Sequence, residues 1–168
     1  YLNELYKLDA DHFAWMKPRI SGDAPKGRLQ HSLNLFDNQL FVFGGIGDKK
    51  IGSQPEIFGD LCCFDVGTSQ WVEHFSTGTP PCKRYGHGSV TIGHRLIIFG
   101  GKGDSSKGDL NDLLTFDGIE KAWSKPRVDY LPPAPRTRAT LSFVPGKGLF
   151  VFGGTGAEPQ TGQNRYVF

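Results

Sequence analysis

Arginine and histidine side chains recur along the chain at a fixed spacing that suits two kinds of chemistry. The pattern Pro-x-x-Arg-x-x-His occurs at Pro25, Arg28 and His31 and at Pro81, Arg84 and His87, and Arg136 follows Pro133 in the same way. A guanidinium can hold a carboxylate or a phosphate through two parallel hydrogen bonds. The same group, repeated once per structural unit, can instead bond carbonyl groups of a neighbouring unit, and the sequence leaves both roles open. The histidines favour a structural role, because an imidazole can bridge two backbone groups.

Residue types that form catalytic and metal sites lack the spacing that such sites need. Cys82, His87 and His94 include no Cys-x-x-Cys or His-x-x-x-His pair, which argues against zinc. No set of serine, histidine and aspartate has the positional signature of a nucleophilic site. The run Gly100-Gly-Lys-Gly103 does not match a phosphate-binding Gly-x-x-x-x-Gly-Lys-Ser/Thr loop. We therefore expect no enzymatic activity, no metal and no cofactor.

Charge, hydrophobicity and cysteine content exclude several classes of partner. The 168 residues include 19 Lys and Arg against 17 Asp and Glu, and this net charge of +2 is too small to predict binding to nucleic acid. The longest apolar run falls far short of the ~20 residues that a membrane span needs, so we expect no membrane association. Three cysteines, Cys62, Cys63 and Cys82, cannot all pair within one chain. Reduced thiols are the simpler interpretation and favour a cytoplasmic location.

The elements that must position the recurring side chains are themselves repeated. The run Leu40 to Gly45, four apolar residues and two glycines, returns as Leu96 to Gly101 and as Leu149 to Gly154. Such runs read as short buried strands followed by a turn that needs glycine. We expect structural roles for the paired glycines Gly44, Gly45, Gly100, Gly101, Gly153 and Gly154. The chain is therefore an array of repeated units.

Each repeat contains four strand-like runs. In the middle repeat these are residues 87–92, 95–99, 112–117 and 121–125, and short hairpin signals such as Asp37-Asn38 and Gly93-His94 join the first run to the second. Longer glycine-rich loops, residues 46–58, 102–110 and 155–163, join the second run to the third. Four antiparallel strands repeated every ~50 residues are typical of a β-propeller blade.

Three further markers share the same period and carry a family resemblance. Trp15, Trp71 and Trp123 are 56 and 52 residues apart, and each stands six residues after an aspartate that ends a strand-like run. We expect these tryptophans to pack between blades. Together with the double glycines and the Pro-x-x-Arg-x-x-His pattern, they make the chain resemble the kelch repeat, in the subgroup with long repeats. The third repeat departs from the pattern, because Ala139 stands where a histidine is expected.

The resemblance implies an all-β kelch-type β-propeller, present here as an incomplete arc. We expect a partial blade in residues 1–27, complete blades in residues 28–83 and 84–135, and a second partial blade in residues 136–168. Two complete blades cannot close the six-bladed ring usual for this family. We favour a longer protein that supplies the remaining blades over a second copy that completes the ring, since native propellers remove open sheet edges by closure.

The order of the strands predicts a binding face. In a meander of four strands, the long loops and the Pro-Arg crossings between blades lie at the same end. Kelch propellers commonly bind peptides at such a face, and a ring of positive charge would steer an acidic or phosphorylated segment toward it. We expect the partner-binding residues to be Arg28, Lys49, Lys50, Arg84, Tyr85, Lys102, Ser105, Lys107, Arg136 and Arg138.

The function that we predict is therefore a non-catalytic protein-interaction module for a protein or peptide partner. Two alternatives remain from other classes. An enzyme with a site at the propeller centre would show strongly shifted carboxylate or histidine pKa values near the axis. A structural segment that self-assembles would show contacts through its two partial blades.

Overall fold

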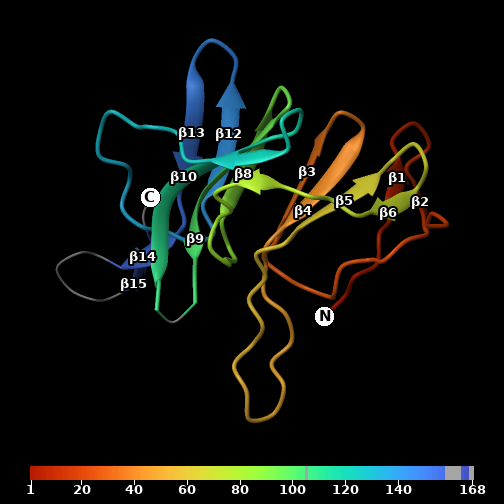
Figure 1. Ribbon diagram of the computed structural model, residues 1–168, viewed down its shortest axis with the longest axis horizontal. Helices are drawn as coiled ribbons and strands as arrows, with labels where there is room; N and C mark the ends of the chain where they lie inside the picture. Colours follow the sequence, from red (N-terminus) through yellow and green to blue (C-terminus); the bar gives the residue numbers. More distant parts are fainter. Residues whose placement is uncertain (105, 158–163, 167–168) are drawn as a thin grey trace.

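The computed structural model describes residues 1–104, 106–157 and 164–166, and their regular structure consists of β-strands joined by turns and loops. The strands form separate antiparallel sheets that stand side by side as the blades of an incomplete propeller (Figure 1). The expected fold class, an incomplete arc of a kelch-type β-propeller, is confirmed.

The first complete blade is a four-stranded meander in the order of the chain. Its strands are β3 (Ser32–Phe36), β4 (Gln39–Phe43), β5 (Leu61–Asp65) and β6 (Gln70–Val72). Asp37 and Asn38 join β3 to β4 with φ of 49° and 58°, the left-handed conformation that a two-residue hairpin favours and that Asn and Asp tolerate.

The second complete blade repeats this order with longer strands. It contains β8 (Gly88–Ile92), β9 (Arg95–Lys102), β10 (Asp109–Asp117) and β11 (Ala122–Ser124). β9 and β10 extend past the predicted ranges 95–99 and 112–117, because a bulge between Leu110 and Leu113 lets their pairing resume at Gly101 and Lys102. The short β7 (Thr77–Gly78) pairs in parallel with the outer strand β11, a contact that the repeat pattern did not predict.

Smaller sheets stand at both ends of the arc. β1 (Lys7–Asp9) pairs with β2 (Ala14–Met16) on the N-terminal side. On the C-terminal side β12 (Thr140–Val144) pairs with β13 (Gly148–Phe152), and β14 (Thr155–Ala157) pairs with β15 (Asn164–Tyr166). β3, β8 and β12 are the inner strands, and β8 contacts both of the others.

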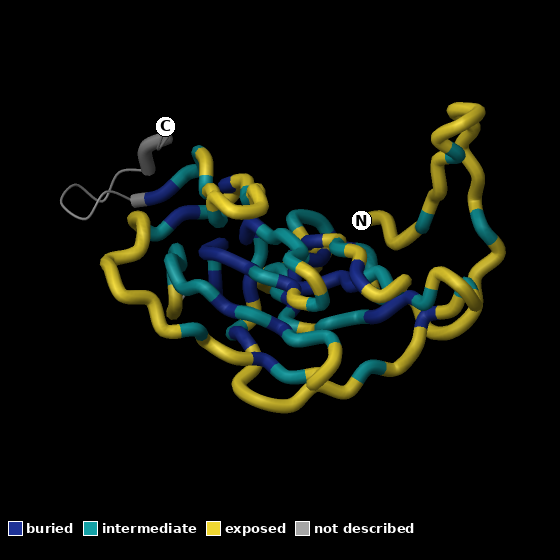
Figure 2. The backbone as a smooth tube through the Cα atoms, turned by 90° about the horizontal axis from the view of Figure 1, so that it is seen from above, coloured by how far each residue is buried: buried dark blue, intermediate teal, exposed yellow. Residues whose placement is uncertain are grey.

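The main hydrophobic core lies between the two complete blades. Phe41 and Phe43 project from β4 toward Phe116 and Trp123 of the next blade, with ring centroids 5.8 Å apart for Phe41 and Phe116 and 5.1 Å apart for Phe43 and Trp123. All four rings are buried, and the buried residues gather where the blades meet (Figure 2). Burying aromatic rings in this way contributes much of the stability of such a core.

The three tryptophans do not share one environment. Trp123 lies between blades as expected. Trp71 forms a second buried cluster with Val42 and Phe64, and Leu5 of the N-terminal segment packs against this cluster. Trp15, by contrast, is 70% exposed, which contradicts its expected packing between blades.

The paired glycines bring neighbouring blades into close contact. Gly44 has φ of 63°, and a Cβ built on it would stand 2.6 Å from the carbonyl oxygen of Arg84 in the next blade. The N–H of Gly45 donates to that same oxygen at 2.8 Å, and Gly101 repeats the contact with Arg136. A side chain at Gly44 would separate the two blades, so the position needs glycine.

Candidate functional site: the loop face

The long loops and the crossings between blades meet at one end of the molecule, as the strand order predicts. We call this end the loop face; it comprises the loops 46–58 and 102–109 and the crossings 24–30, 80–86 and 133–138. Backbone bridges join each loop to a crossing, with Ile46 pairing Leu29 and Lys102 pairing Tyr85. In Figure 1 the loop 46–58 projects far beyond the sheets, and the hairpin tips lie at the opposite end.

The arginines of the first two crossings are buried in equivalent contacts. Arg84 donates from Nη1 to the Gly100 carbonyl oxygen at 3.0 Å and holds both carboxylate oxygens of Asp112 at 2.7 and 2.8 Å. Arg28 makes the same fork with Asp60, at 2.7 and 2.9 Å, and bonds the Gly44 carbonyl. Each arginine therefore ties its crossing to the second and third strands of its own blade.

In these two ion pairs the arginine side chain is more deeply buried than the aspartate side chain. The side chain of Arg84 is fully buried and that of Arg28 is 4% exposed, whereas Asp60 is 45% exposed. Burial alone would raise the pKa of Asp60, but the hydrogen bonds and charge of Arg28 outweigh it, so this pKa is lowered. The ring of Phe58 covers the Arg28 guanidinium at 4.0 Å. Arg84 also donates to the carbonyl oxygen and the Sγ atom of Cys82, so all five of its N–H groups have acceptors.

Arg136 repeats part of this arrangement in the last described blade. Its Nε donates to the Ala134 carbonyl and its Nη1 to the Gly153 carbonyl, both at 3.1 Å. The three arginines predicted as partner-binding residues thus lie in the interior. This arrangement favours the structural alternative that the sequence had left open.

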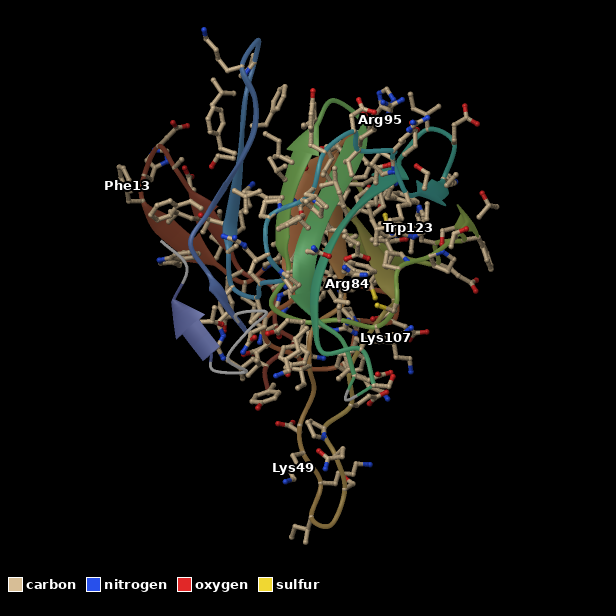
Figure 3. The ribbon with its side chains drawn as sticks, turned by 90° about the vertical axis from the view of Figure 1, so that its left-hand side faces the viewer. Phe13, Lys49, Arg84, Arg95, Lys107 and Trp123 are labelled. Carbon is tan, nitrogen blue, oxygen red and sulfur yellow. The ribbon has the colours of Figure 1, made fainter. Side chains whose placement is uncertain are left out.

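Several of the other predicted residues are exposed. Lys49, Lys50, Lys107 and Arg138 project into solvent, and none of them forms an ion pair with a residue that the structure describes. Lys49 and Lys107 lie toward the same end of the molecule, and Arg95 lies toward the hairpin end (Figure 3). Ser105, the remaining loop residue predicted to bind a partner, lies outside the described residues.

Backbone contacts gather three of the predicted residues near the inner strands. Tyr85 and Lys102, both half-buried, exchange two backbone hydrogen bonds of 3.0 and 2.8 Å. The N–H of Arg138 donates to the carbonyl of Gly86, the residue after Tyr85, at 2.6 Å. Lys49 and Lys50 lie apart from this group, on the projecting loop.

Sequence reasoning missed a chain of backbone contacts that links successive blades. Gln30, Gly86 and Arg138 occupy equivalent positions, and all have φ between 55° and 64°. The Gly86 N–H donates to the backbone carbonyl oxygen of Gln30 at 2.8 Å, and the Arg138 N–H donates to that of Gly86. Because Gln and Arg rarely adopt this conformation, residue type gave no signal for it.

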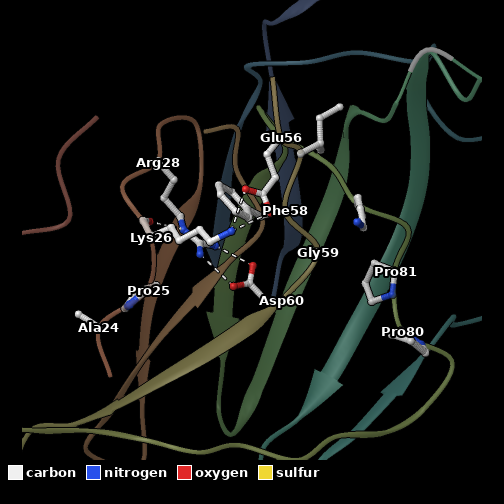
Figure 4. Close-up of a pocket in the computed structure, with 12 residues that line it drawn as sticks. Ala24, Pro25, Lys26, Arg28, Glu56, Phe58, Gly59, Asp60, Pro80 and Pro81 are labelled. Carbon is white, nitrogen blue, oxygen red and sulfur yellow. Dashed lines mark hydrogen bonds and ion pairs between the residues drawn. The ribbon is translucent and has the colours of Figure 1, made fainter. Parts of the chain in front are cut away.

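A groove of about 620 Å³ lies on the loop face between two crossings. Phe58 and the prolines Pro25, Pro80 and Pro81 give it apolar walls, and Lys26 pairs with Glu56 across it at 3.0 Å (Figure 4). The charged groups of this groove are largely paired with one another. A sequence signal for the aspartates that hold the arginines existed, since Asp60 and Asp112 each stand five residues before the aspartate that ends the third strand of their blade.

The strongest shift of a histidine pKa belongs to a buried structural group. Burial, followed by the charges of Arg84 and His31, lowers the pKa of His87 to about 3. The Nε2 atom of its ring lies 3.0 Å from the Ser32 hydroxyl, and the ring packs edge-on against Phe43. His87 therefore joins the inner strands of two blades as a neutral imidazole.

The three cysteines are free, and the thiols of Cys62 and Cys63 are hard to ionise. Burial, and then the charge of Asp60, raise the pKa of Cys62 to about 12, and burial raises that of Cys63 to about 11. Both thiols therefore stay protonated and weakly nucleophilic near neutral pH.

Among the described residues no helix is long and apolar enough to cross a membrane.

Comparison with known proteins agrees with this geometry. The family model for the KLHDC2/KLHL20/DRC7 Kelch-repeats domain matches residues 1–168, so the chain belongs to the kelch-repeat family. Host cell factor 2 from Homo sapiens is 30% identical over 98% of the chain. The Rab9 effector protein with kelch motifs from Mus musculus is 32% identical over 92% of the chain, and Kelch domain-containing protein 3 from Bos taurus is 28% identical over 96%. The chain spans only 22% to 43% of the length of these relatives.

Proposed function

We propose that the chain is a non-catalytic protein-interaction module that binds an acidic or phosphorylated segment of a partner on its loop face. The observation that carries this proposal is the set of exposed cations Lys49, Lys50, Lys107 and Arg138, which have no acidic partner among the described residues. Unpaired cations on one face create a positive potential that steers anionic partners. Membership of the kelch-repeat family supports an interaction role, because one related protein is named as an effector of Rab9.

The buried arginines make the binding surface narrower than the sequence suggested. Arg28 and Arg84 already hold Asp60 and Asp112, so a partner would have to break a buried ion pair to reach them. The exposed cations instead fall into two groups. Lys49 and Lys50 sit on the projecting loop. The second group is Lys107, on the loop that begins at Lys102, and Arg138, which lies beside Tyr85 near the inner strands. An extended peptide that contacts both groups would cross the loop face between the crossings.

The other features of the chain agree with a module that lacks catalysis. The shifted pKa of His87, which an enzyme at the propeller centre would predict, is explained by its burial against Ser32 and Phe43. The blade boundaries 28–83 and 84–135 remain part of the proposal. So does the binding of a protein in preference to nucleic acid, given the net charge of +2.

Binding of synthetic peptides tests the proposal. Fluorescence polarisation would compare an acidic phosphoserine peptide with its neutral counterpart, in which glutamine and serine replace the charged residues. We expect the acidic peptide to bind at least about tenfold more tightly, a difference of ~1.4 kcal/mol, and to weaken as salt increases. The double variant Lys107→Glu/Arg138→Glu should remove this preference.

The matched control is Lys147→Glu, a charge reversal at an exposed lysine in the hairpin between β12 and β13, at the opposite end of the molecule. It should leave binding of the acidic peptide unchanged. Equal affinity for both peptides, or an equal loss in the control, would contradict the proposal.

A further inference from the structure

One position of the repeat carries asparagine in two repeats and glycine in the repeat between them. Asn3, Gly59 and Asn111 each stand six residues before the aspartate that ends a third strand. In all three repeats the carbonyl oxygen of the residue before this position accepts from the arginine N–H of the next crossing. These bonds join Arg28 to Leu2, Arg84 to Phe58 and Arg136 to Leu110, at 3.3, 3.0 and 3.0 Å. The three positions are therefore structurally equivalent.

The two asparagines use this position to hold a crossing. Nδ2 of Asn3 donates to the carbonyl oxygen of Pro25, and Nδ2 of Asn111 donates to that of Pro133, both at 3.3 Å. Each proline stands 22 residues after its asparagine. The molecule thus shows twice which group fits beside this carbonyl, namely a side-chain carboxamide.

Gly59 leaves the equivalent carbonyl without this donor. Pro81 follows Gly59 by the same number of residues. It is buried, and no hydrogen bond from a described residue ends at its carbonyl oxygen. The φ of Gly59 lies outside the left-handed region, so the backbone conformation does not require glycine here. Because buried carbonyl groups are as a rule hydrogen-bonded, that of Pro81 is suited to a donor from a ligand.

Gly59 and Pro81 both line the groove of about 620 Å³ between the crossings (Figure 4). Phe58, Pro25 and Pro80 add apolar walls to it. This volume lies in the range of pockets that bind ligands, and it is larger than one carboxamide group needs. The walls can therefore also cover apolar residues on either side of a carboxamide in an extended peptide.

The charges in the groove favour a neutral occupant that both donates and accepts. Two of its cations are already paired with carboxylates, Arg28 with Asp60 and Lys26 with Glu56. Lys83, which also lines the groove, forms no ion pair with a described residue and can donate to an oxygen. A carboxamide offers N–H donors for the Pro81 carbonyl and an acceptor for Lys83, whereas an ionised carboxylate has only acceptors.

We propose that this groove binds an asparagine side chain of a partner peptide, with apolar residues of the peptide on either side. The asparagine amide donates to the carbonyl oxygen of Pro81 and so takes the place that Asn3 and Asn111 hold in the neighbouring repeats. The flanking residues pack on Phe58 and Pro80. This inference is independent of the acidic segment proposed above, because it concerns a neutral side chain and does not use the cations of the outer loops.

An NMR titration of the chain of residues 1–168 with two short peptides tests the proposal. The probe is acetyl-Leu-Pro-Asn-Pro-Leu-amide, and its counterpart of equal shape has aspartate in place of asparagine. We expect the asparagine peptide to bind at least about tenfold more tightly, because the aspartate would set an acceptor against the Pro81 carbonyl. The backbone amide signals of Gly59 and Lys83 should shift. Equal affinities, tighter binding of the aspartate peptide, or no shift at Gly59 and Lys83 would overturn the proposal.

Substitution of Gly59 tests the position of the carboxamide. Gly59→Asn supplies the amide from the chain itself, so it should abolish binding of the asparagine peptide and raise the urea midpoint above that of Gly59→Ala. Gly59→Ala is the matched control, because both variants add a Cβ 3.0 Å from Cγ of Lys83 but only one adds an amide. It should keep the preference for asparagine over aspartate. Unchanged binding in Gly59→Asn, or an equal loss in Gly59→Ala with dispersed spectra that show both variants folded, would contradict the proposal.

Discussion

At the scale of single residues, arginine and lysine of the same charge have different surroundings. The guanidinium of Arg84 makes a planar fork that fits the Asp112 carboxylate and the Gly100 carbonyl at once, which a lysine ammonium could not do. Lys107 and Lys49 lie on loops where their charges stay hydrated. Burial beside a carboxylate therefore marks Arg28 and Arg84 as part of the scaffold, and the proposed recognition rests on the exposed lysines.

Replacing Arg84 tests this division. Arg84→Met would leave the largely buried Asp112 carboxylate without its partner, and breaking a buried pair in this way costs roughly 3–5 kcal/mol. Lys107→Met removes an equal charge from an exposed site and should change the free energy of unfolding by less than about 0.5 kcal/mol. Urea unfolding of both variants measures the difference. Similar losses in the two would show that Arg84 does not hold its blade together.

His87 should make stability depend on pH. Its pKa is lowered to about 3 in the folded protein, mainly by burial, whereas an unfolded histidine has a pKa of about 6.5. Between these values the unfolded chain binds a proton that the folded protein does not bind. Stability is thus complete above pH ~6.5 and falls as the pH drops through this window, by up to ~1.4 kcal/mol per pH unit for one proton.

Urea unfolding at pH values from 7 to 5 measures this dependence. His31 and His74, whose pKa values are also lowered by burial, add a dependence of the same sign. In His87→Gln the slope should decrease by the contribution of one proton, whatever the change in stability at pH 7. A slope equal to that of the wild type would mean that His87 is protonated in the folded protein.

At the scale of strands and blades, stability depends on which neighbour each blade has. Trp71 and Trp15 occupy the same position in successive repeats, yet only Trp71 is covered by a preceding segment, through Leu5. We expect Trp71→Ala to cost roughly 3–5 kcal/mol. Trp15→Ala should cost less than about 0.5 kcal/mol, because its ring is exposed.

Thermal or urea unfolding gives both values. The quantity predicted is the difference between the two variants in the free energy of unfolding lost. A large loss for Trp15→Ala would mean that its ring is covered, and the arrangement of the β1–β2 sheet would then be wrong.

Much of the fold could be predicted from the sequence because its signals are local and repeated. Double glycines, aspartate-ended strands and hairpin dipeptides placed the four strands of each blade to within a few residues. The parallel pairing of β7 with β11 and the backbone chain through Gln30 and Gly86 could not be predicted, because they depend on contacts between blades. For the site, spacing located the arginines but could not assign their role. Only their burial beside Asp60 and Asp112 separates a scaffold group from a binding group.

At the scale of the whole molecule, the two ends of each blade carry different kinds of connection. The hairpin ends carry short turns such as Asp37-Asn38. The loop ends carry the long segments 46–58 and 102–109 and the cations that lack ionic partners among the described residues. The double glycines Gly44-Gly45 and Gly100-Gly101 link the scaffold to the loop face, since each pair brings neighbouring blades into contact and is followed by a long loop. A scaffold of this kind keeps the loops in place while their sequences vary.

Hydrogen exchange with a bound peptide tests the central claim, that the loop face is the binding face. The probe is the acidic phosphoserine peptide, added in excess to the chain of residues 1–168. We predict slower exchange of backbone amides in the loops 46–58 and 102–109 and in the crossing 133–138, with no change at the hairpin tips 37–38, 93–94 and 145–147. Protection confined to the hairpin tips, or no protection by the peptide at all, would contradict the account.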